Sequence, residues 1–509
     1  MEETSSGIPD SKDENHATEL QTFLPQDGKI TIVPTSGEAK ASERKSLAND
    51  DLGGRFNPFT SRQTPIKSRT TDTETLIHIL KASVGTGILG MPYAFMNAGL
   101  SVGIFGTVLI ALICTHCAYV LVKCAHELYY RHQIPMLTFA GIGETAFTRG
   151  PESMRKYARL CKLTVMTMLF LTYFGTLCVY SVIVGNSIQQ VIEHYTESAM
   201  DPRIYIAALL VPLMFLGFTP NLKMLAPVSL VANLCMVVGL GITAYYLLQD
   251  QSALEYTPLI APLSGLPQFF SITVFAMEAI GVMMPLENSM KNPPHFLRIW
   301  NICGVLNIGM TFVTIVYAAI GFIGYVRYGE LTQGAITLNL PTEEGLAQTV
   351  KIMVAVAVFC TYGLQFFVCL EIAWGSLKEK FADRPLMGEC IVRASLVVAS
   401  IIIAVAVPTI GPFMGLIGAL CFSVLGIVLP AIIETVMYWD KPSFIPYYEN
   451  ADEFSLPLDF KPKDGHGLGY GKWVLYKNIF ILIFGFCGIC TGSYTSVLNI
   501  IEEYTTKES

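Results

Sequence analysis

Eleven long apolar runs dominate the chain from residue 74 to residue 500. A helix of about 20 apolar residues spans the roughly 30 Å hydrocarbon core of a bilayer, whereas a membrane barrel would need alternating strands of about 10 residues, and these are not seen. Hydrophobic residues make up 52% of the chain and charged residues only 14%. The sequence therefore predicts an all-α membrane protein with eleven transmembrane helices, at about residues 74–98, 100–124, 161–192, 204–219, 224–248, 267–288, 299–326, 346–375, 390–408, 410–436 and 474–500.

The two ends of the chain lack such runs. Residues 1–73 are rich in Ser, Thr, Asp, Glu and Pro, so we expect a disordered tail and not a cleaved signal peptide. Successive spans alternate in direction, so every second connecting segment lies on the same side of the membrane as this tail. Most Lys and Arg residues fall in those segments. Because cytoplasmic loops retain positive charge, the tail is predicted to be cytosolic. Residues 74–500 then form the eleven-helix domain, and residues 501–509 form a short outer or lumenal tail.

Two of the predicted spans are interrupted near their middle. The first contains Gly85, Thr86 and Gly87, and the sixth contains Glu278 followed by Gly281 and by a proline one turn later. An unwound turn cannot leave its backbone groups facing lipid, so it persists only where protein or a polar ligand satisfies them. The first and sixth spans each open a set of five. We therefore expect a five-plus-five inverted repeat with discontinuous helices 1 and 6 plus one extra helix. The alternative is that these Gly and Pro residues serve helix packing.

Such interruptions predict a site for a small zwitterion. The amino-terminal amides of the half-helix that begins near Ile88 would hold a carboxylate, and freed carbonyl groups of both broken spans would hold an ammonium group. An α-amino acid has both groups. The candidate substrate-binding residues are Ser83, Gly85, Thr86, Gly87, Ile88, Phe275, Glu278 and Gly281.

His78 and Glu278 are the candidate proton-coupling residues. His78 lies seven residues before Gly85 and shares a helix face with Lys81. A histidine side chain with a pKa near 6.5 can take up a proton from a mildly acidic compartment and release that proton to a near-neutral one. Glu278, at mid-bilayer, could be a protonated carboxyl group or an ion paired with His78 or Lys81. The residues alone are equally consistent with a structural role and with a role in proton coupling for either side chain.

The other charged residues near the membrane receive less specific predictions. We expect His116 to be a packed, neutral histidine. A second group lies near inner helix ends and is expected to reach the interface or to cap helices: Lys81, Glu287, Glu371 and Glu434. A basic stretch before the first span is assigned to topology and to contact with anionic lipid of the inner leaflet: Arg55, Arg62, Lys67 and Arg69.

Three segments resemble a known family. They are LIHILKASVGTGILGMPYAFMNAG (76–99), IGVMMPLENSMKNP (280–293) and GAITLNLP (334–341), and together they are similar to the eukaryotic proton-coupled amino acid transporters of the amino acid/auxin permease group. The resemblance implies a leucine-transporter-like fold and symport of small neutral amino acids with protons. It further implies a plasma-membrane or endolysosomal location, a part in proton coupling for His78 and a place at the site for Glu278.

The sequence departs from that family in two places. In vertebrate members a disulfide is thought to link two outer loops, yet the loops 193–203 and 327–346 contain no Cys here, so no outer disulfide is expected. The family's FSFEGIG appears as VFAMEAIG at 274–281, which changes the pocket wall at Ala276, Met277 and Ala279. We therefore expect a preferred substrate that differs from that of the relatives.

The resulting hypothesis is a secondary active transporter that carries small neutral amino acids into the cytosol with protons. Two alternatives stay open: sodium coupling through carbonyl groups of the first break and a hydroxyl such as that of Thr361, and an amino-acid sensor or receptor with little flux. No nucleophile with a base and no cluster of metal ligands is visible, so neither an enzyme nor a metal site is expected. Protons are the only cofactor-like species predicted. The expected partners are amino acids, the bilayer and possible signalling proteins on the cytosolic tail and loops, and no nucleic acid.

Overall fold

The computed structural model describes residues 58–59, 62, 69–196, 200–219, 222–249, 257–277, 279–298, 303–439, 468 and 472–508. Helices and their connections make up this part of the chain, with one isolated parallel bridge between Thr70 and Met290 and no β-strand. The predicted disordered tail falls almost entirely outside the described residues. So do Glu278 and most of residues 437–473, the connection between the last two predicted spans. The all-α prediction is confirmed.

Nine helices of the described chain are long and apolar enough to cross a membrane. Two further predicted spans appear in pieces. The first is divided into α3 (Asp72–Ser83) and α4 (Gly87–Ala98), and the fourth into α9 (Pro202–Ala208) and α10 (Leu210–Gly217). The remaining spans are α5 (Leu100–His132), α8 (Ala158–Thr196), α11 (Leu222–Gln249), α12 and α13 (Leu266–Met277 and Ile280–Ser289), α15 (Val305–Tyr328), α16 (Gly345–Leu377), α17 (Pro385–Ala406), α18 through α19 (Ile410–Ile417 and Leu429–Tyr438) and α20 (Trp473–Glu508).

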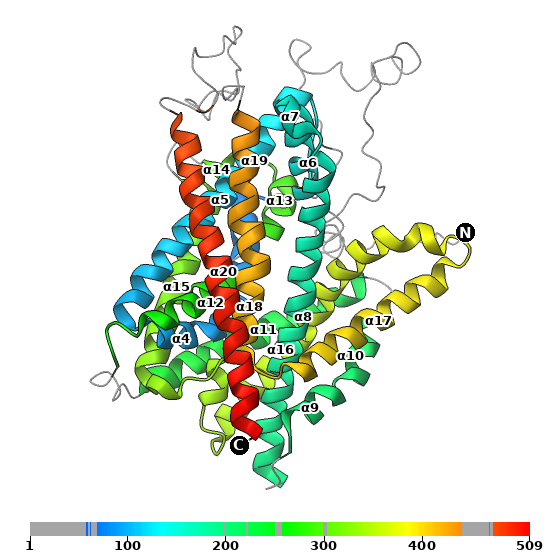
Figure 1. The fold of residues 1–509 in the computed structure, drawn as a ribbon. Helices are drawn as coiled ribbons and strands as arrows, with labels where there is room; N and C mark the ends of the chain where they lie inside the picture. Colours follow the sequence, from blue (N-terminus) through cyan, green and yellow to red (C-terminus); the bar gives the residue numbers. More distant parts are fainter. Residues whose placement is uncertain are drawn as a thin grey trace, which may run out of the picture.

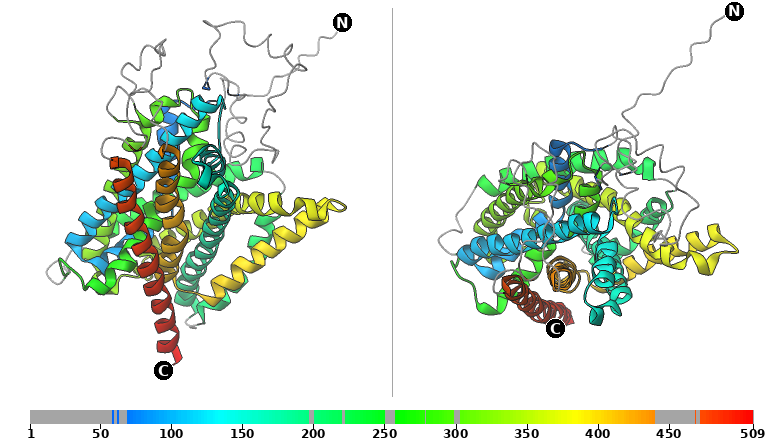
Figure 2. Two further views of the ribbon diagram at one scale, coloured as in Figure 1. Left: turned by 45° about the horizontal axis from the view of Figure 1, so that its top comes forward. Right: turned by 90° about the horizontal axis from the view of Figure 1, so that it is seen from above.

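The bundle has two distinct ends (Figure 1). One end carries α6 (Phe139–Arg149), α7 (Glu152–Arg155), α13 and α14 (Pro294–Leu297), and is called the α6 end below. The other carries α9 and the end of α20, and is called the α9 end. Figure 2 shows α20 at the edge of the bundle beside α19 when the molecule is viewed from above. α20 is therefore an outer addition to the core of the fold.

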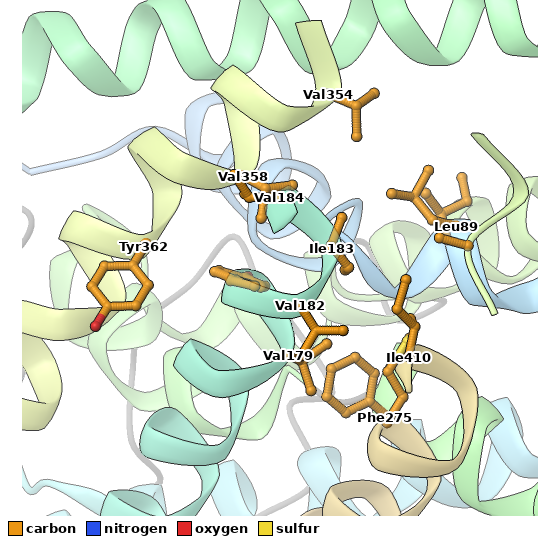
Figure 3. Close-up of a cluster of buried hydrophobic side chains, with 14 of the residues drawn as sticks. Leu89, Val179, Val182, Ile183, Val184, Phe275, Val354, Val358, Tyr362 and Ile410 are labelled. Atoms are coloured by element: carbon orange, nitrogen blue, oxygen red, sulfur yellow. The ribbon is translucent and has the colours of Figure 1, made fainter. Parts of the chain in front are cut away.

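The core lies where α4, α8, α12, α16 and α18 meet. Figure 3 shows Leu89, Ile183, Phe275 and Ile410 converging from four of these helices. Because lipid tails are as apolar as these side chains, close packing and not water exclusion holds such helices together, and small residues at the contacts are decisive. A Cβ atom added to Gly418, in the π-helical turn η7 (Gly418–Phe422), would lie 2.0 Å from the Ser271 carbonyl oxygen of α12.

Both predicted interruptions are present. α3 ends at Ser83 and α4 begins at Gly87, as expected from the glycines of the first span. In the sixth span, the sequence placed the interruption at Glu278, Gly281 and the proline beyond them. The break is shorter, because α12 ends at Met277 and α13 already begins at Ile280. Gly281 and Pro285 thus lie inside α13, where neighbouring protein makes a proline tolerable.

Candidate functional site

The break between α3 and α4 exposes backbone groups that ordinary helical hydrogen bonds would occupy. The Gly85 amide donates to the Ser83 carbonyl oxygen at 2.8 Å, and the Ile88 amide lies 3.4 Å from the Gly85 carbonyl oxygen. The Ser83 hydroxyl is buried and has no hydrogen-bond partner among the described residues. A Cβ atom added to Gly85 would have no atom within 4 Å. The break therefore combines an unused hydroxyl with open space.

Tyrosine hydroxyls surround this break. The buried Tyr317 of α15 donates a hydrogen bond to the Ser83 carbonyl oxygen. Tyr180 of α8 places its hydroxyl beside the side chains of Thr86 and Gln365. The freed backbone of the first span is thus met by polar protein groups, as the lipid environment requires. Sequence analysis missed both tyrosines, although a tyrosine in the middle of an apolar span needs a polar partner and is a usable signal.

The two breaks touch each other. A Cβ atom added to Gly87 would lie 2.6 Å from Cα of Ala276, near the end of α12. On the other side of the second break, a Cβ atom added to Gly281 would lie 2.7 Å from the Tyr173 hydroxyl oxygen of α8. The residues that the sequence identified in two distant segments therefore form one locus in the middle of the bundle.

The candidate substrate residues occupy different positions around this locus. Five are buried: Ser83, Thr86, Gly87, Ile88 and Phe275. The Phe275 ring meets the ring of Phe422 edge to face, with centroids 5.4 Å apart, so it belongs to the apolar wall. Glu278 lies outside the described residues. No group of three or more potential metal ligands occurs in the described part of the chain, and all thirteen Cys are free.

A small cavity extends from the locus toward the α6 end. Its volume is about 40 Å³ and it lies between α6, α8, α13 and α16. Gly281 is the one candidate substrate residue in its lining, which also includes Tyr173 and Asn288. A volume of this size holds one or two waters and is smaller than an amino acid. The path toward the α6 end is therefore narrow in this conformation.

His78 lies on α3, one and a half turns from its carboxyl end. Its side chain is half-buried and close enough to interact electrostatically with the Glu74 carboxylate. The expected neighbour Lys81 is exposed on the same helix. The structure thus places His78 on the first half-helix and outside the lining of the cavity.

The prediction for Glu287 is wrong. This residue does not reach the interface, because its side chain is 0% exposed and pairs with Arg62, whose Nη2 lies 2.7 Å from Oε1. His126 Nε2 lies 2.9 Å from the same oxygen. Arg62, assigned above to lipid contact, is likewise buried. Sequence could not find this cluster, because the three residues come from separate segments. Glu434 is also buried, and pairs with Lys477 at 2.7 Å.

Comparison with known proteins decides the family. Residues 68–444 match the family described as transmembrane amino acid transporter protein. The chain belongs to this family. The transporter is 48% identical to the Drosophila melanogaster protein named proton-coupled amino acid transporter-like protein pathetic, over 503 residues that cover 99% of each chain. It is 26% identical to amino acid transporter AVT3C of Arabidopsis thaliana over 411 residues, covering 77% of this chain and 88% of the relative.

A solved structure supports the architecture. The inward-facing conformation of Mhp1 aligns with a TM-score of 0.51 at 13% identity, over 90% of this chain and 96% of that one. This likeness shows the fold alone, which is the expected leucine-transporter-like arrangement with two discontinuous helices. The protein is a multi-pass membrane transporter, and its family is one of transporters and not of enzymes.

Proposed function

We propose that this transporter carries small neutral amino acids into the cytosol together with protons. The observation that carries the proposal is the contact between the two helix breaks at Gly87 and Ala276, beside the unpartnered Ser83 hydroxyl. The amino-terminal amides of α4 offer partial positive charge to a carboxylate, and carbonyl groups at the breaks offer partial negative charge to an ammonium group. A neutral zwitterion is thus satisfied without a fixed ion pair. The proposed binding residues are Ser83, Gly85, Thr86, Gly87, Ile88, Phe275, Glu278 and Gly281.

Proton coupling is supported by the name of the Drosophila relative, which describes a proton-coupled amino acid transporter-like protein. We assign the proton to His78 and to Glu278. One pH unit corresponds to about 1.4 kcal/mol, and 100 mV to about 2.3 kcal/mol per charge. One proton moved with a neutral amino acid could therefore sustain accumulation of roughly a few hundredfold.

The proposed topology follows from the distribution of Lys and Arg. It places residues 1–73 and the α6 end in the cytosol and residues 501–509 outside or in a lumen, at the plasma membrane or an endolysosomal membrane. With this orientation the cavity beside Gly281 is the path toward the cytosol. Signalling partners of the tail and loops belong to the same proposal.

Proton-driven uptake tests the coupling. Purified protein in sodium-free liposomes, with an acidic outside, is expected to accumulate alanine, glycine or proline, and to discriminate against lysine and glutamate. If accumulation requires sodium, the coupling ion is sodium and not the proton. Tight amino-acid binding with negligible flux would instead favour a receptor.

A histidine pair tests the proton site. His78→Ala is expected to abolish pH-driven accumulation while exchange of amino acid across the membrane persists, because exchange needs no net proton movement. His116→Ala is the matched control, since His116 is also half-buried at membrane depth but lies on α5, where its charged neighbours are Lys477, Glu434 and Lys123. Unchanged pH dependence in His78→Ala would reject this assignment.

A further inference from the structure

A polar side chain in the middle of α16 reaches toward the first break. Gln365 is hydrogen-bonded to the Tyr180 hydroxyl of α8, and the same hydroxyl is hydrogen-bonded to the side chain of Thr86, the residue before α4. The Tyr180 hydroxyl is also close enough to that of Tyr317 to interact with it electrostatically. Gln365 is therefore one side chain away from the backbone that the first break exposes.

Gln365 lies on a face of α16 that borders the interior of the bundle. Val368 and Ile372 follow Gln365 on the same side of the helix at intervals of three and four residues, and both line the cavity that extends from Gly281 toward the α6 end. The Gln365 side chain is only partly buried, although its partner Tyr180 is buried. The amide of Gln365 therefore borders internal space between the cavity and the first break.

The Gln365 amide has hydrogen-bonding capacity that Tyr180 does not use. A glutamine side chain has two N–H donors and an oxygen with two lone pairs, and one hydrogen bond to a hydroxyl occupies only one of these positions. One turn away on the same face, the Thr361 hydroxyl donates to the Ala357 carbonyl oxygen at 2.7 Å, so this hydroxyl is used within α16. The remaining positions of the Gln365 amide are thus available to a ligand beside the break.

The contact between the two breaks limits where the side chain of a bound amino acid can lie. A Cβ atom added to Gly87 would lie 2.6 Å from Cα of Ala276, so no side chain fits between α4 and α12 at this point. A Cβ atom added to Gly85 would meet no atom within 4 Å. If the carboxylate of the amino acid lies at the amides that begin α4, its side chain has to point away from α12, toward the helices from which Tyr180 and Gln365 reach the break.

Other side chains of the core offer no such polar group. Figure 3 shows Val179 and Ile183 of α8 with Phe275 of α12 and Ile410 of α18, and all four are apolar and buried. An apolar wall distinguishes poorly between side chains of equal size. A polar group in the wall distinguishes better, because an apolar ligand covers it without replacing its hydrogen bonds. Gln365 is thus placed to discriminate among small side chains.

We propose that Gln365 selects the side chain of the carried amino acid and favours serine over an apolar amino acid of the same size. This inference rests on the proposed function and specifies its substrate. The serine hydroxyl donates to the Gln365 carbonyl oxygen or accepts from its amide group. A methyl group in the same place covers the amide and forms no hydrogen bond with it. Gln365 is then a specificity-determining residue, and Tyr180 orients its amide.

Competition in the wild-type protein is the first test. Exchange of labelled glycine in liposomes tests the proposed function independently of Gln365, because glycine has no side chain. Unlabelled serine and L-2-aminobutyrate are then compared as inhibitors of this exchange, since they differ only by a hydroxyl group in place of a methyl group. Serine is expected to inhibit at a concentration at least fivefold lower. Equal or absent inhibition by the two, with glycine exchange intact, would overturn the role of Gln365. Absence of glycine exchange would overturn the proposed function, and this inference with it.

Gln365→Met tests the residue directly, because it removes the amide and keeps an unbranched side chain of similar length. The preference for serine over L-2-aminobutyrate is expected to fall below twofold, while the KM for glycine changes less than threefold. If Gln365 only supported Tyr180, glycine and both inhibitors would weaken alike and the preference would persist, and that result would reject the proposal. Gln365→Leu carries the same expectation and takes the place of Gln365→Met if that variant does not reach the membrane.

Gln348→Met is the matched control on the same helix. The Gln348 side chain is also bonded to a tyrosine, since its Oε1 accepts from the Tyr195 hydroxyl at 2.6 Å, but it lies in the first turn of α16. This variant is expected to keep the wild-type preference for serine. Loss of the preference in Gln348→Met as well would show that it depends on the packing of α16 in general, and the assignment to Gln365 would be wrong. All of these measurements use exchange, so they do not depend on the proton assignment.

Discussion

The breaks divide the first and sixth spans into half-helices, which form one pair on each side of the breaks. The two members of a pair are held together by different contacts on the two sides. Toward the α6 end, the start of α3 and the segment before it are joined to α13 and α14 by a buried ion pair, a backbone bridge and a partly exposed ion pair. Toward the α9 end, α4 meets its neighbours through small residues, with Gly87 against Ala276 of α12 and Gly90 against Met414 of α18 and Ile272 of α12.

This difference shows how each pair resists separation. Each van der Waals atom pair contributes only about 0.1–0.2 kcal/mol, so a small shift between α4 and α12 changes the energy little. A buried ion pair is different, because separating it leaves charges without compensation unless water or a new partner reaches them. The α4–α12 pair can therefore adjust by small shifts around a ligand more easily than the Arg62–Glu287 pair can part. The predictions below test this contrast.

The largest expected effect is that of Glu287→Ala. Removing this carboxylate leaves Arg62 buried without its charged partner, which costs about 3–5 kcal/mol. We expect a lower midpoint of thermal unfolding in detergent, measured against Glu152→Ala, whose exposed pair with Arg155 at 3.8 Å should make no detectable contribution. Equal midpoints for the two variants would contradict the burial of the α3–α13 ion pair.

Gly87→Ala tests the van der Waals side of the comparison. The added methyl group would meet the Ala276 backbone at 2.6 Å, and overpacking of this kind costs about 1–3 kcal/mol. We expect the rate of amino-acid uptake to fall about tenfold, because the two breaks are forced apart. Gly241→Ala, where the added methyl group meets no atom within 4 Å, is the control. If both variants transport equally well, the contact between the breaks is not required.

Tyr317→Phe tests the break of the first span, which lies between the two pairs of half-helices. The change removes the hydroxyl that donates to the Ser83 carbonyl oxygen and leaves the Gly85 amide as the donor to that oxygen, at a cost of about 0.5–1.5 kcal/mol. Apparent amino-acid affinity is expected to fall, while protein abundance in the membrane stays near the wild-type level. Tyr494→Phe, on the exposed side of α20, should have no effect. An unchanged affinity in Tyr317→Phe would show that the break holds its geometry without this hydrogen bond.

Asp72→Asn should have the smallest effect. The Asp72 and His295 side chains are 34% and 29% exposed, and such partly exposed pairs contribute about 0–1 kcal/mol. We expect exchange within twofold of wild type and almost the same unfolding midpoint. A loss as large as that of Glu287→Ala would mean that exposure does not decide the strength of the charged contacts between these helices at the α6 end.

Much of the architecture could be predicted from local sequence. Span length is a property of each apolar run, and the glycines at 85 and 87 predicted the break because glycine removes the steric preference for a continuous helix. The second break was located less well. Gly281 and Pro285 suggested an extended interruption, yet both are helical because α8 and the other neighbours support the start of α13.

The sequence by itself determined the all-helical membrane architecture, the break in the first span and the type of ligand groups offered there, because all of these depend on residues close together in the chain. Tertiary structure alone decided which side chains meet. Arg62, His126 and Glu287 are separated by up to 225 positions, and each had a plausible separate role as a basic tail residue, a helix residue or an interfacial acid. Only their convergence in a place without water makes them one buried cluster, because a charge there needs a partner that no local pattern specifies.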